Sequence, residues 1–205
     1  MEFADVVVRR RMVRSFTDEP VDEQVLRQML AHATRAPSAG NSQGWEFIVL
    51  QGPEQTARFW DVTLPADRRS GFRWPGLLRA PVLVLPLANA GRYVDRYAEP
   101  DKAATGLGQG SGSWPVPYWM VDTAFATMTL LHSVVDAGLG ALFFGIFRNE
   151  ATLLTALGVP DEFRPIGAVA IGHPAPDRPG RSSGRPRRPL DEVVHWGGWT
   201  PTEGH

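Results

Sequence analysis

The stretch YWMVDTAFATMTLLHSVVDAG, residues 118–138, decides the fold of this chain. Its apolar residues fall on almost every side of a helix, and such a helix is buried on most of its sides. Gly138 marks its end, because glycine readily adopts the left-handed conformation that follows a last helical turn. The apolar strand GALFFGIF, residues 140–147, comes next. We therefore expect a buried central helix that leads directly into a sheet.

Further helices and strands surround this centre. Asp22 suits a helix cap and Pro37 a helix stop, while Pro53 suits a first helical turn. Pro86 suggests that its strand ends there or lies at a sheet edge. The expected helices cover residues 2–14, 23–36, 53–64, 118–138 and 149–158, and the expected strands cover residues 46–51, 82–88, 140–147 and 165–172. The pattern indicates one α+β domain over residues 1–205.

Composition limits the classes of function. The formal net charge is −1, so nothing draws the whole chain to nucleic acid or to a membrane surface. There is no cysteine, which excludes disulfides, thiol nucleophiles and zinc–thiolate sites. Residues 1–20 lack the apolar run of a signal peptide, and no long uninterrupted apolar segment occurs. We expect a cytoplasmic protein without a nucleic-acid or membrane partner.

Several stretches resemble known catalytic or binding motifs but lack the flanking elements or the spacing that those motifs require. The glycines of GLGQGSGS, residues 106–113, are followed by WPVP instead of a helix, so a flexible loop or lid is a better interpretation than a dinucleotide fingerprint. The five histidines show no metal-ligand spacing, and we expect no metal site. No serine–histidine–acid set or carboxylate pair is visible. If the chain is an enzyme, a cofactor performs the difficult chemistry.

Two groups of arginines are candidates for binding an anion. In the predicted helix 2–14, Arg10 and Arg14 lie one turn apart and could grip an extended anionic ligand. A proline-stiffened segment near the C-terminus carries Arg185 and Arg187 on the same side. Guanidinium groups match phosphate oxygens bidentately, so the two groups together suit a phosphate dianion. A solvated basic face and a solvated tail are the alternatives.

These stretches, in this order, resemble the nitroreductase family of FMN-dependent oxidoreductases. The family pattern is similar to RRMVRSFTDEPV at residues 10–21 and to APSAGNSQGWEFIVL at residues 36–50. Residues 121–147 are similar to its central helix and following strand, and residues 166–174 and 185–196 to its last strand and basic C-terminal segment. The resemblance covers most of the chain except residues 52–118.

The resemblance implies an α+β sandwich in which helices flank a central, mostly antiparallel sheet. It also implies an interlocked homodimer with FMN at the subunit interface and a C-terminal extension, residues 174–205, that packs on the body or on the partner. By position, Arg14 would be the catalytic cation beside the N1/O2 edge of the flavin. The other residues that would contact the cofactor are Arg10, Arg11, Met12, Pro37, Ser38, Ala39, Asn41, Phe144, Gly145, Ile146, Arg185 and Arg187.

Two positions depart from the family pattern. Met12 replaces the usual serine, so we expect a side-chain hydrogen bond to the flavin to be lost or moved. Gly44 replaces the usual proline before Trp45, and we expect a looser turn there. Neither departure removes a predicted phosphate ligand.

The resemblance implies reduction of nitro, quinone or related conjugated acceptors by NAD(P)H through FMN. Residues 89–118 could form a lid over a small aromatic substrate, with Trp114, Tyr118 and Trp119 in contact with it; an ordinary aromatic packing loop is the alternative. The fold also hosts reductive dehalogenation, flavin fragmentation and deazaflavin-dependent reduction, and a non-catalytic flavin-binding protein is a further alternative.

Overall fold

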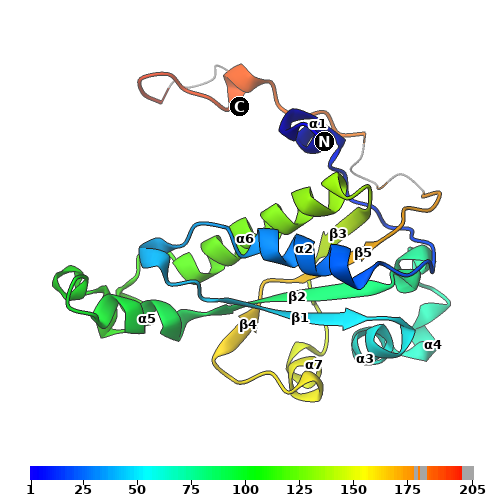
Figure 1. Cartoon of the computed structure of the whole chain (residues 1–205), viewed down its shortest axis with the longest axis horizontal. Coiled ribbons are helices and arrows are strands. Elements are labelled where there is room, and N and C mark those ends of the chain that lie inside the picture. Colours follow the sequence, from blue (N-terminus) through cyan, green and yellow to red (C-terminus); the bar gives the residue numbers. More distant parts are fainter. Residues whose placement is uncertain (178–179, 181–183, 200–205) are drawn as a thin grey trace.

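A computed structural model describes residues 1–177, 180 and 184–199 of the chain. Its centre is one antiparallel sheet with the strand order β1-β2-β5-β3, and β4 pairs with β2 beyond the end of β5 (Figure 1). The strands are β1 (Trp45–Gln51), β2 (Val82–Asn89), β3 (Gly140–Phe144), β4 (Phe163–Pro165) and β5 (Ala168–Gly172). This sheet confirms the predicted α+β class.

Helices cover both faces of the sheet. α2 (Glu23–Ala33) and α6 (Tyr118–Asp136) lie on one face, and α3 (Pro53–Thr63) and α7 (Glu150–Leu157) on the other (Figure 1). Buried apolar side chains form one cluster on each side of the sheet. The remaining α-helices are α1 (Phe3–Arg9), α4 (Ala66–Arg69) and α5 (Ala90–Ala98). None of the described helices is long and apolar enough to cross a bilayer.

Strand β2 is the most buried element, and the prediction from Pro86 is wrong. All eight residues of β2 are buried, and Pro86 lies inside the strand opposite Phe47. The N–H of Asn89 points to β1, so by alternation the nitrogen of Pro86 faces the opposite neighbour. There β4 ends at Pro165 and β5 begins at Ala168, so the ladder is interrupted. Proline is tolerated in a central strand because no donor is needed at that gap.

The N-terminal helix is shorter than predicted. α1 ends at Arg9, and the chain then runs in extended form along the edge of β3. The N–H of Val13 donates to the carbonyl oxygen of Ala141 over 2.9 Å, and Met12 forms a bridge with the same residue. The extended form buries Val13, which a helix there would not bring to the sheet. Arg10 and Arg14 are therefore not one helical turn apart, and that argument from spacing is wrong.

The central helix is confirmed, but it is not buried on most sides. One face of α6 packs on the sheet through Ala126, Leu130 and Val134, each fully buried. The opposite face exposes Phe125 by 48% and Met128 by 37%. Both faces are apolar, which explains why the sequence pattern indicated burial all round.

Most other boundaries agree with the sequence to within a few residues. Pro53 begins α3 and Gly158, at φ +69°, follows α7, as predicted. Asn149 precedes α7, although its side chain makes no capping bond and instead donates to the carbonyl oxygen of Val62. The predicted strand 140–147 ends at Phe144, and the predicted strand 165–172 is split into β4 and β5. Helices α4 and α5 were not predicted.

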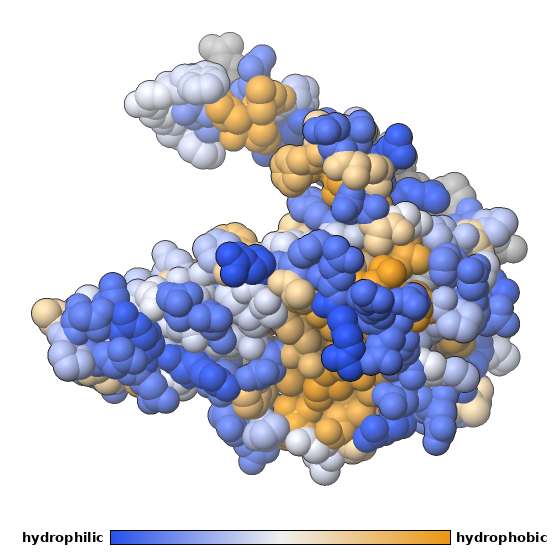
Figure 2. Space-filling view, in the orientation of Figure 1, coloured by the Kyte–Doolittle hydropathy of each residue, from blue (hydrophilic) through white to orange (hydrophobic). Residues whose placement is uncertain are grey.

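Two parts of the chain project from the sandwich. Residues 90–117 form the excursion, which extends beyond one end of the sheet through α5 and three short 3-10 turns (Figure 1). Residues 184–199 form the arm, which projects beyond α1 on the side of α6 (Figure 1). The predicted C-terminal extension, 174–205, lies partly outside the described residues. Its described arm does not pack on the sandwich of its own chain, as the hollow in Figure 2 shows.

The cap of α2 gives a test of the fold. The Asp22 carboxylate accepts the N–H groups of Gln24 and Val25 at 2.8 and 3.1 Å. We expect Asp22→Ala to lower the free energy of unfolding by about 1 kcal/mol, the usual contribution of an N-cap. The control Glu23→Ala removes only an exposed i,i+4 pair with Arg27 and should change it by about 0.5 kcal/mol or less. Urea titration followed by circular dichroism measures both, and equal effects would contradict the capping role.

Candidate functional site

The candidate site is a cavity of about 390 Å³ between the edge of β3 and the helices that follow β1. It brings together Arg14 and residues 144–146, which the sequence analysis proposed as flavin contacts from distant parts of the chain. Its walls are largely aromatic and include Phe72 and Trp74. Residues of the lining that the sequence did not point to include Phe59, Trp60, Phe147 and Arg148.

Arg14 is fixed from three directions. Its backbone N–H donates to the Asp177 carboxylate at 2.9 Å, and its Nη1 donates to the carbonyl oxygen of Met12 at 3.3 Å. Its guanidinium also lies over the ring of Trp74, 5.4 Å from the centroid, where a cation is attracted to the π face. Arg14 takes part in none of the ion pairs between described residues. The guanidinium therefore has no carboxylate partner among the described residues, and the nearby Asp177 carboxylate binds the backbone N–H instead.

Trp60 contributes a donor that has no partner. It is 6% exposed, and among the described residues its indole N–H is the one buried side-chain polar atom without a hydrogen bond. The ring lies parallel to that of Phe144, with 5.8 Å between centroids. Buried donors are rarely left unsatisfied, so this N–H suits a ligand or a water. No spacing in the sequence pointed to Trp60, because it reads as an apolar helix residue.

Residues 144–146 connect the end of β3 to the cavity. All three are half-buried, and no described strand pairs with the chain beyond Phe144. A Cβ at Gly145 would lie 2.8 Å from Cε1 of Phe147, whose ring is 92% exposed and would have to move aside. Backbone groups at this point therefore lie open to a ligand in the cavity.

The other predicted arginines are not in this cavity. Arg10 is half-buried at the end of α1, and its charge acts on His132 of α6. Arg11 is exposed. Arg185 and Arg187 are exposed on the arm, and their neighbour Arg188 pairs with Glu192. A single chain thus does not gather Arg10, Arg14 and the arm at one place.

The turn at residues 37–44 also lies apart from the cavity. It precedes β1, whereas the cavity is lined by Arg14, by residues that lie between β1 and β2 in the chain, and by residues 142–148 at the end of β3. None of the residues of this turn lines the cavity. The predicted contacts Pro37, Ser38, Ala39 and Asn41 are therefore not brought to Arg14 within one chain.

The two departures from the family pattern have structural reasons. Met12 packs against both core clusters, which accounts for an apolar residue at this position. The prediction that Gly44 loosens its turn is wrong. A Cβ there would overlap the ring of Tyr93 and lie 2.9 Å from the carbonyl oxygen of Asn89. Gly44 is the residue that leaves room for Tyr93, and the turn is tightly packed.

The three aromatic residues predicted to touch substrate differ from one another. Trp114 is 8% exposed, donates its indole N–H to the carbonyl oxygen of Leu107 at 3.0 Å, and packs edge-on against Tyr97. These contacts favour the packing interpretation for Trp114, and its contact with substrate stays a prediction. Tyr118 is exposed and Trp119 half-buried at the start of α6, and their contact with substrate stays a prediction.

Comparison with known proteins identifies similar chains. Residues 7–173 match the Nitroreductase family. The FMN reductase [NAD(P)H] of Bacillus subtilis is 30% identical over 186 residues, which cover 90% of this chain and 69% of that protein. The hypothetical oxidoreductase YcnD from Bacillus subtilis has a TM-score of 0.75 at 28% identity, covering 98% of this chain and 76% of the other. A putative nitroreductase from Exiguobacterium sibiricum in complex with FMN has a TM-score of 0.74 at 18% identity, covering 96% and 97% of the two chains.

The position of the Arg10 charge can be tested through the pKa of His132, which lies close enough to respond to it. Burial first and the Arg10 charge second lower the pKa of His132 below its ordinary value of 6.5. We expect Arg10→Gln to raise the pKa of His132 part of the way back, and the control Arg11→Gln, at an exposed position, to leave it unchanged. NMR titration of the ring protons measures this.

A linked effect follows for stability. Because the unfolded chain binds this proton more readily, the neutral His132 contributes stability above pH 6.5 that is lost as the pH falls below that value. If the pKa of His132 does not change in Arg10→Gln, the Arg10 charge does not lie near His132.

Proposed function

The chain belongs to the nitroreductase family, and we propose that it uses FMN and NAD(P)H to reduce nitro, quinone or related conjugated acceptors by ping-pong hydride transfer. The observation that carries this proposal is the fixed cation of Arg14, which forms no ion pair with a described residue, in an aromatic cavity beside residues 144–146. The FMN reductase relative and the FMN complex of a structural neighbour support the choice of cofactor.

The residues present fit a flavin. A planar, largely apolar ring system suits walls made of Phe72, Trp74 and Phe144, and the orphaned N–H of Trp60 suits a ring carbonyl or nitrogen. Arg14 suits the edge of the ring that gains negative charge on reduction. The fit therefore depends on two groups of this chain, the indole N–H of Trp60 and the guanidinium of Arg14, both of which a flavin could pair with.

Bound FMN would supply the hydride chemistry, and the residues of the chain would supply orientation and charge. Arg14 stabilises negative charge beside it, and it is preorganised by Trp74 and Met12, so no rearrangement is needed at the moment of reaction. Backbone groups at residues 144–146 orient the ring. The aromatic walls exclude water from the face that they cover.

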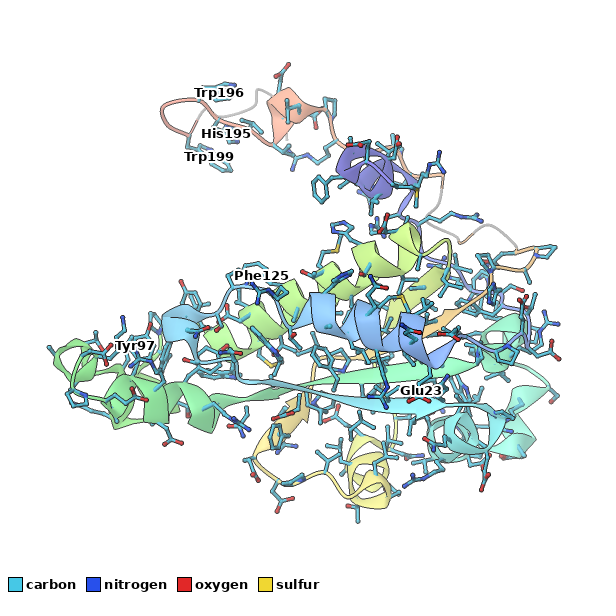
Figure 3. The ribbon with its side chains drawn as sticks, in the orientation of Figure 1. Glu23, Tyr97, Phe125, His195, Trp196 and Trp199 are labelled. Carbon is cyan, nitrogen blue, oxygen red and sulfur yellow. The ribbon has the colours of Figure 1, made fainter. Side chains whose placement is uncertain are left out.

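We propose that the active protein is a homodimer. The open face of α6, with Phe125 and Met128, looks toward the arm, on which Trp196 is 85% and Trp199 82% exposed (Figure 3). α1 adds Phe3 and Val8 at 71% and 83% exposure. Large exposed apolar surfaces of this kind mark interfaces, and an obligate interface resembles a core cut in half.

A dimer also accounts for the scattered flavin residues. The turn at residues 37–41 and the arm with Arg185 and Arg187 are separated from the Arg14 cavity of their own chain. In an interlocked dimer, a second copy supplies the turn, and the arm brings its two arginines to the phosphate. The predicted lid, residues 89–118, and the adjoining start of α6 would then bring Tyr118 and Trp119 to the substrate.

The function is tested on the purified protein. A yellow protein that releases FMN on denaturation and oxidises NADPH or NADH with an added quinone or nitroarene supports the proposal. An absorption spectrum typical of a deazaflavin would show that the cofactor is a deazaflavin and not FMN. Bound FMN without any turnover would indicate a flavin-binding protein, and turnover only with a halogenated aromatic, or consumption of the flavin itself, would indicate another chemistry of the same fold.

Arg14 should act on the redox potential more than on affinity. We expect Arg14→Met to retain FMN but to lower its midpoint potential by about 30–60 mV, because a charge-assisted contact contributes about 1.5–3 kcal/mol and 30 mV is about 1.4 kcal/mol in a two-electron couple. Reduction by NAD(P)H slows accordingly. Arg14→Lys preserves most of the effect, since it keeps the charge. Spectroelectrochemistry and anaerobic stopped-flow measure both variants, and an unchanged potential in Arg14→Met would show that Arg14 is not beside the ring.

The open face of α6 gives a test of the dimer. We expect the protein to sediment as a dimer at micromolar concentration and Phe125→Asp to shift it to a monomer, because a charge would be buried in an apolar interface. The control Ala151→Asp adds the same charge at an exposed position of α7, on the other side of the sheet, and should stay dimeric. A stable monomer that holds FMN would contradict the proposal.

A further inference from the structure

The turn at residues 38–44 is held in an unfavourable backbone conformation. Gly40, Asn41 and Gln43 have φ values of +62°, +56° and +48°. Two of these three are not glycines, and left-handed conformations at such residues cost energy and persist only where the surroundings impose them. Hydrogen bonds within the turn, such as that from the Gln43 N–H to Oγ of Ser38 at 3.0 Å, contribute to this conformation. Further contacts come from two other elements, α6 and the excursion.

The contact from α6 is a buried carboxylate. Asp122 is 2% exposed, and its Oδ2 accepts the backbone N–H of Ala39 at 2.8 Å. The same oxygen accepts the hydroxyl proton of Tyr93 at 2.8 Å. Burial, as the largest cause, raises the pKa of Tyr93 well above its usual range, so the phenol remains a donor at every working pH. No described residue forms an ion pair with Asp122.

The contacts from the excursion close the turn from the other side. Nε of Arg96 donates to the carbonyl oxygen of Gly40 at 2.9 Å, and Asp101 holds the same guanidinium at 2.7 and 2.8 Å. A Cβ at Gly40 would lie 2.8 Å from Cε2 of Tyr97, which Figure 3 shows on the excursion. The ring of Tyr93 occupies the space beside Gly44. The excursion therefore contacts the turn through Arg96, Tyr97 and Tyr93.

We propose that Asp122 is a positioning residue for this turn. The proposal rests on the proposed function, in which the turn contacts the flavin of the partner's site. A buried carboxylate without a cation is costly, and hydrogen bonds to it are short and strong. By drawing the N–H of Ala39 inward, Asp122 fixes the direction of the backbone, and the exposed Pro37 and Asn41 face outward. The excursion holds the turn from the other side, through Arg96, so that the two elements together clamp its backbone.

Two variants at position 122 and a matched control test this role in the full-length protein. Asp122→Ala removes both hydrogen bonds that Asp122 accepts, one from Ala39 of the turn and one from Tyr93 of the excursion, whereas Asp122→Asn keeps an acceptor oxygen for the same donors. The control Thr123→Val alters the next residue of α6, which is also fully buried but whose hydroxyl donates only within the helix, to the carbonyl oxygen of Trp119. Tyr93→Phe is the milder variant, because it removes one hydroxyl and keeps the ring that fills the space beside Gly44.

Three measurements separate positioning from general stability: amide hydrogen exchange over residues 37–44 without FMN, the FMN dissociation constant, and the visible circular dichroism of bound flavin. We expect Asp122→Ala to speed exchange in the turn but not along α6, to weaken FMN binding about tenfold, and to change the flavin dichroism. Asp122→Asn should restore most of these values, Tyr93→Phe should shift them in the same direction by less, and Thr123→Val should leave them unchanged.

The outcomes distinguish this inference from the proposed function. A wild-type protein that binds no FMN overturns the proposed function, and the exchange measurement then still decides whether Asp122 fixes the turn. If amide hydrogen exchange over residues 37–44 is unchanged in Asp122→Ala, Asp122 does not fix the turn. If the alanine variant does not fold, the same conclusion follows from unchanged exchange in Tyr93→Phe. Faster exchange with unchanged FMN affinity and dichroism overturns the role toward the flavin.

Discussion

The site depends on how the chain is bound to the edge of β3 just after α1. The N–H of Val13 donates to the carbonyl oxygen of Ala141, that of Phe16 to Gly76, and that of Thr17 to His173. These three bonds attach one short extended segment to β3, to the turn before β2 and to the chain after β5. Because Val13 and Phe16 enter the core, Arg14 between them has a fixed position. The rigidity of the cation is thus a consequence of packing on either side of it.

Sequence reasoning located the elements whose pattern follows from burial. β2 and α6 were predicted because long apolar runs in a globular chain are stable only when much of their surface is buried, and α2 because Asp22 caps it. The same reasoning failed at residues 10–14, where arginines and apolar residues fit a helix as well as an extended segment. What decides between them is the carbonyl oxygen of Ala141, more than a hundred residues away, and no local pattern contains it.

The site was predictable only in part, for a related reason. Arg14 and residues 144–146 were found through ordered motifs, and they do meet in one cavity. Trp60 was missed because its significance is an indole N–H without a partner, which is a property of the folded structure. Gly44 was misinterpreted because a glycine leaves space, and the sequence does not say which side chain fills it. Tyr93, from an element that was not predicted, fills it here.

The positions of the functional groups along β1 constrain the assembly. One end of β1 leads into the Arg14 cavity, and the other follows the strained turn that Asp122 and the excursion hold. None of the residues of the turn lines the cavity that holds Arg14, so in the proposed dimer each chain would supply one half of each site. A two-fold axis close to the open face of α6 would pair each half-site with the opposite half of a second copy. In the proposed dimer, burial of the apolar face of α6 and completion of the site would be the same event.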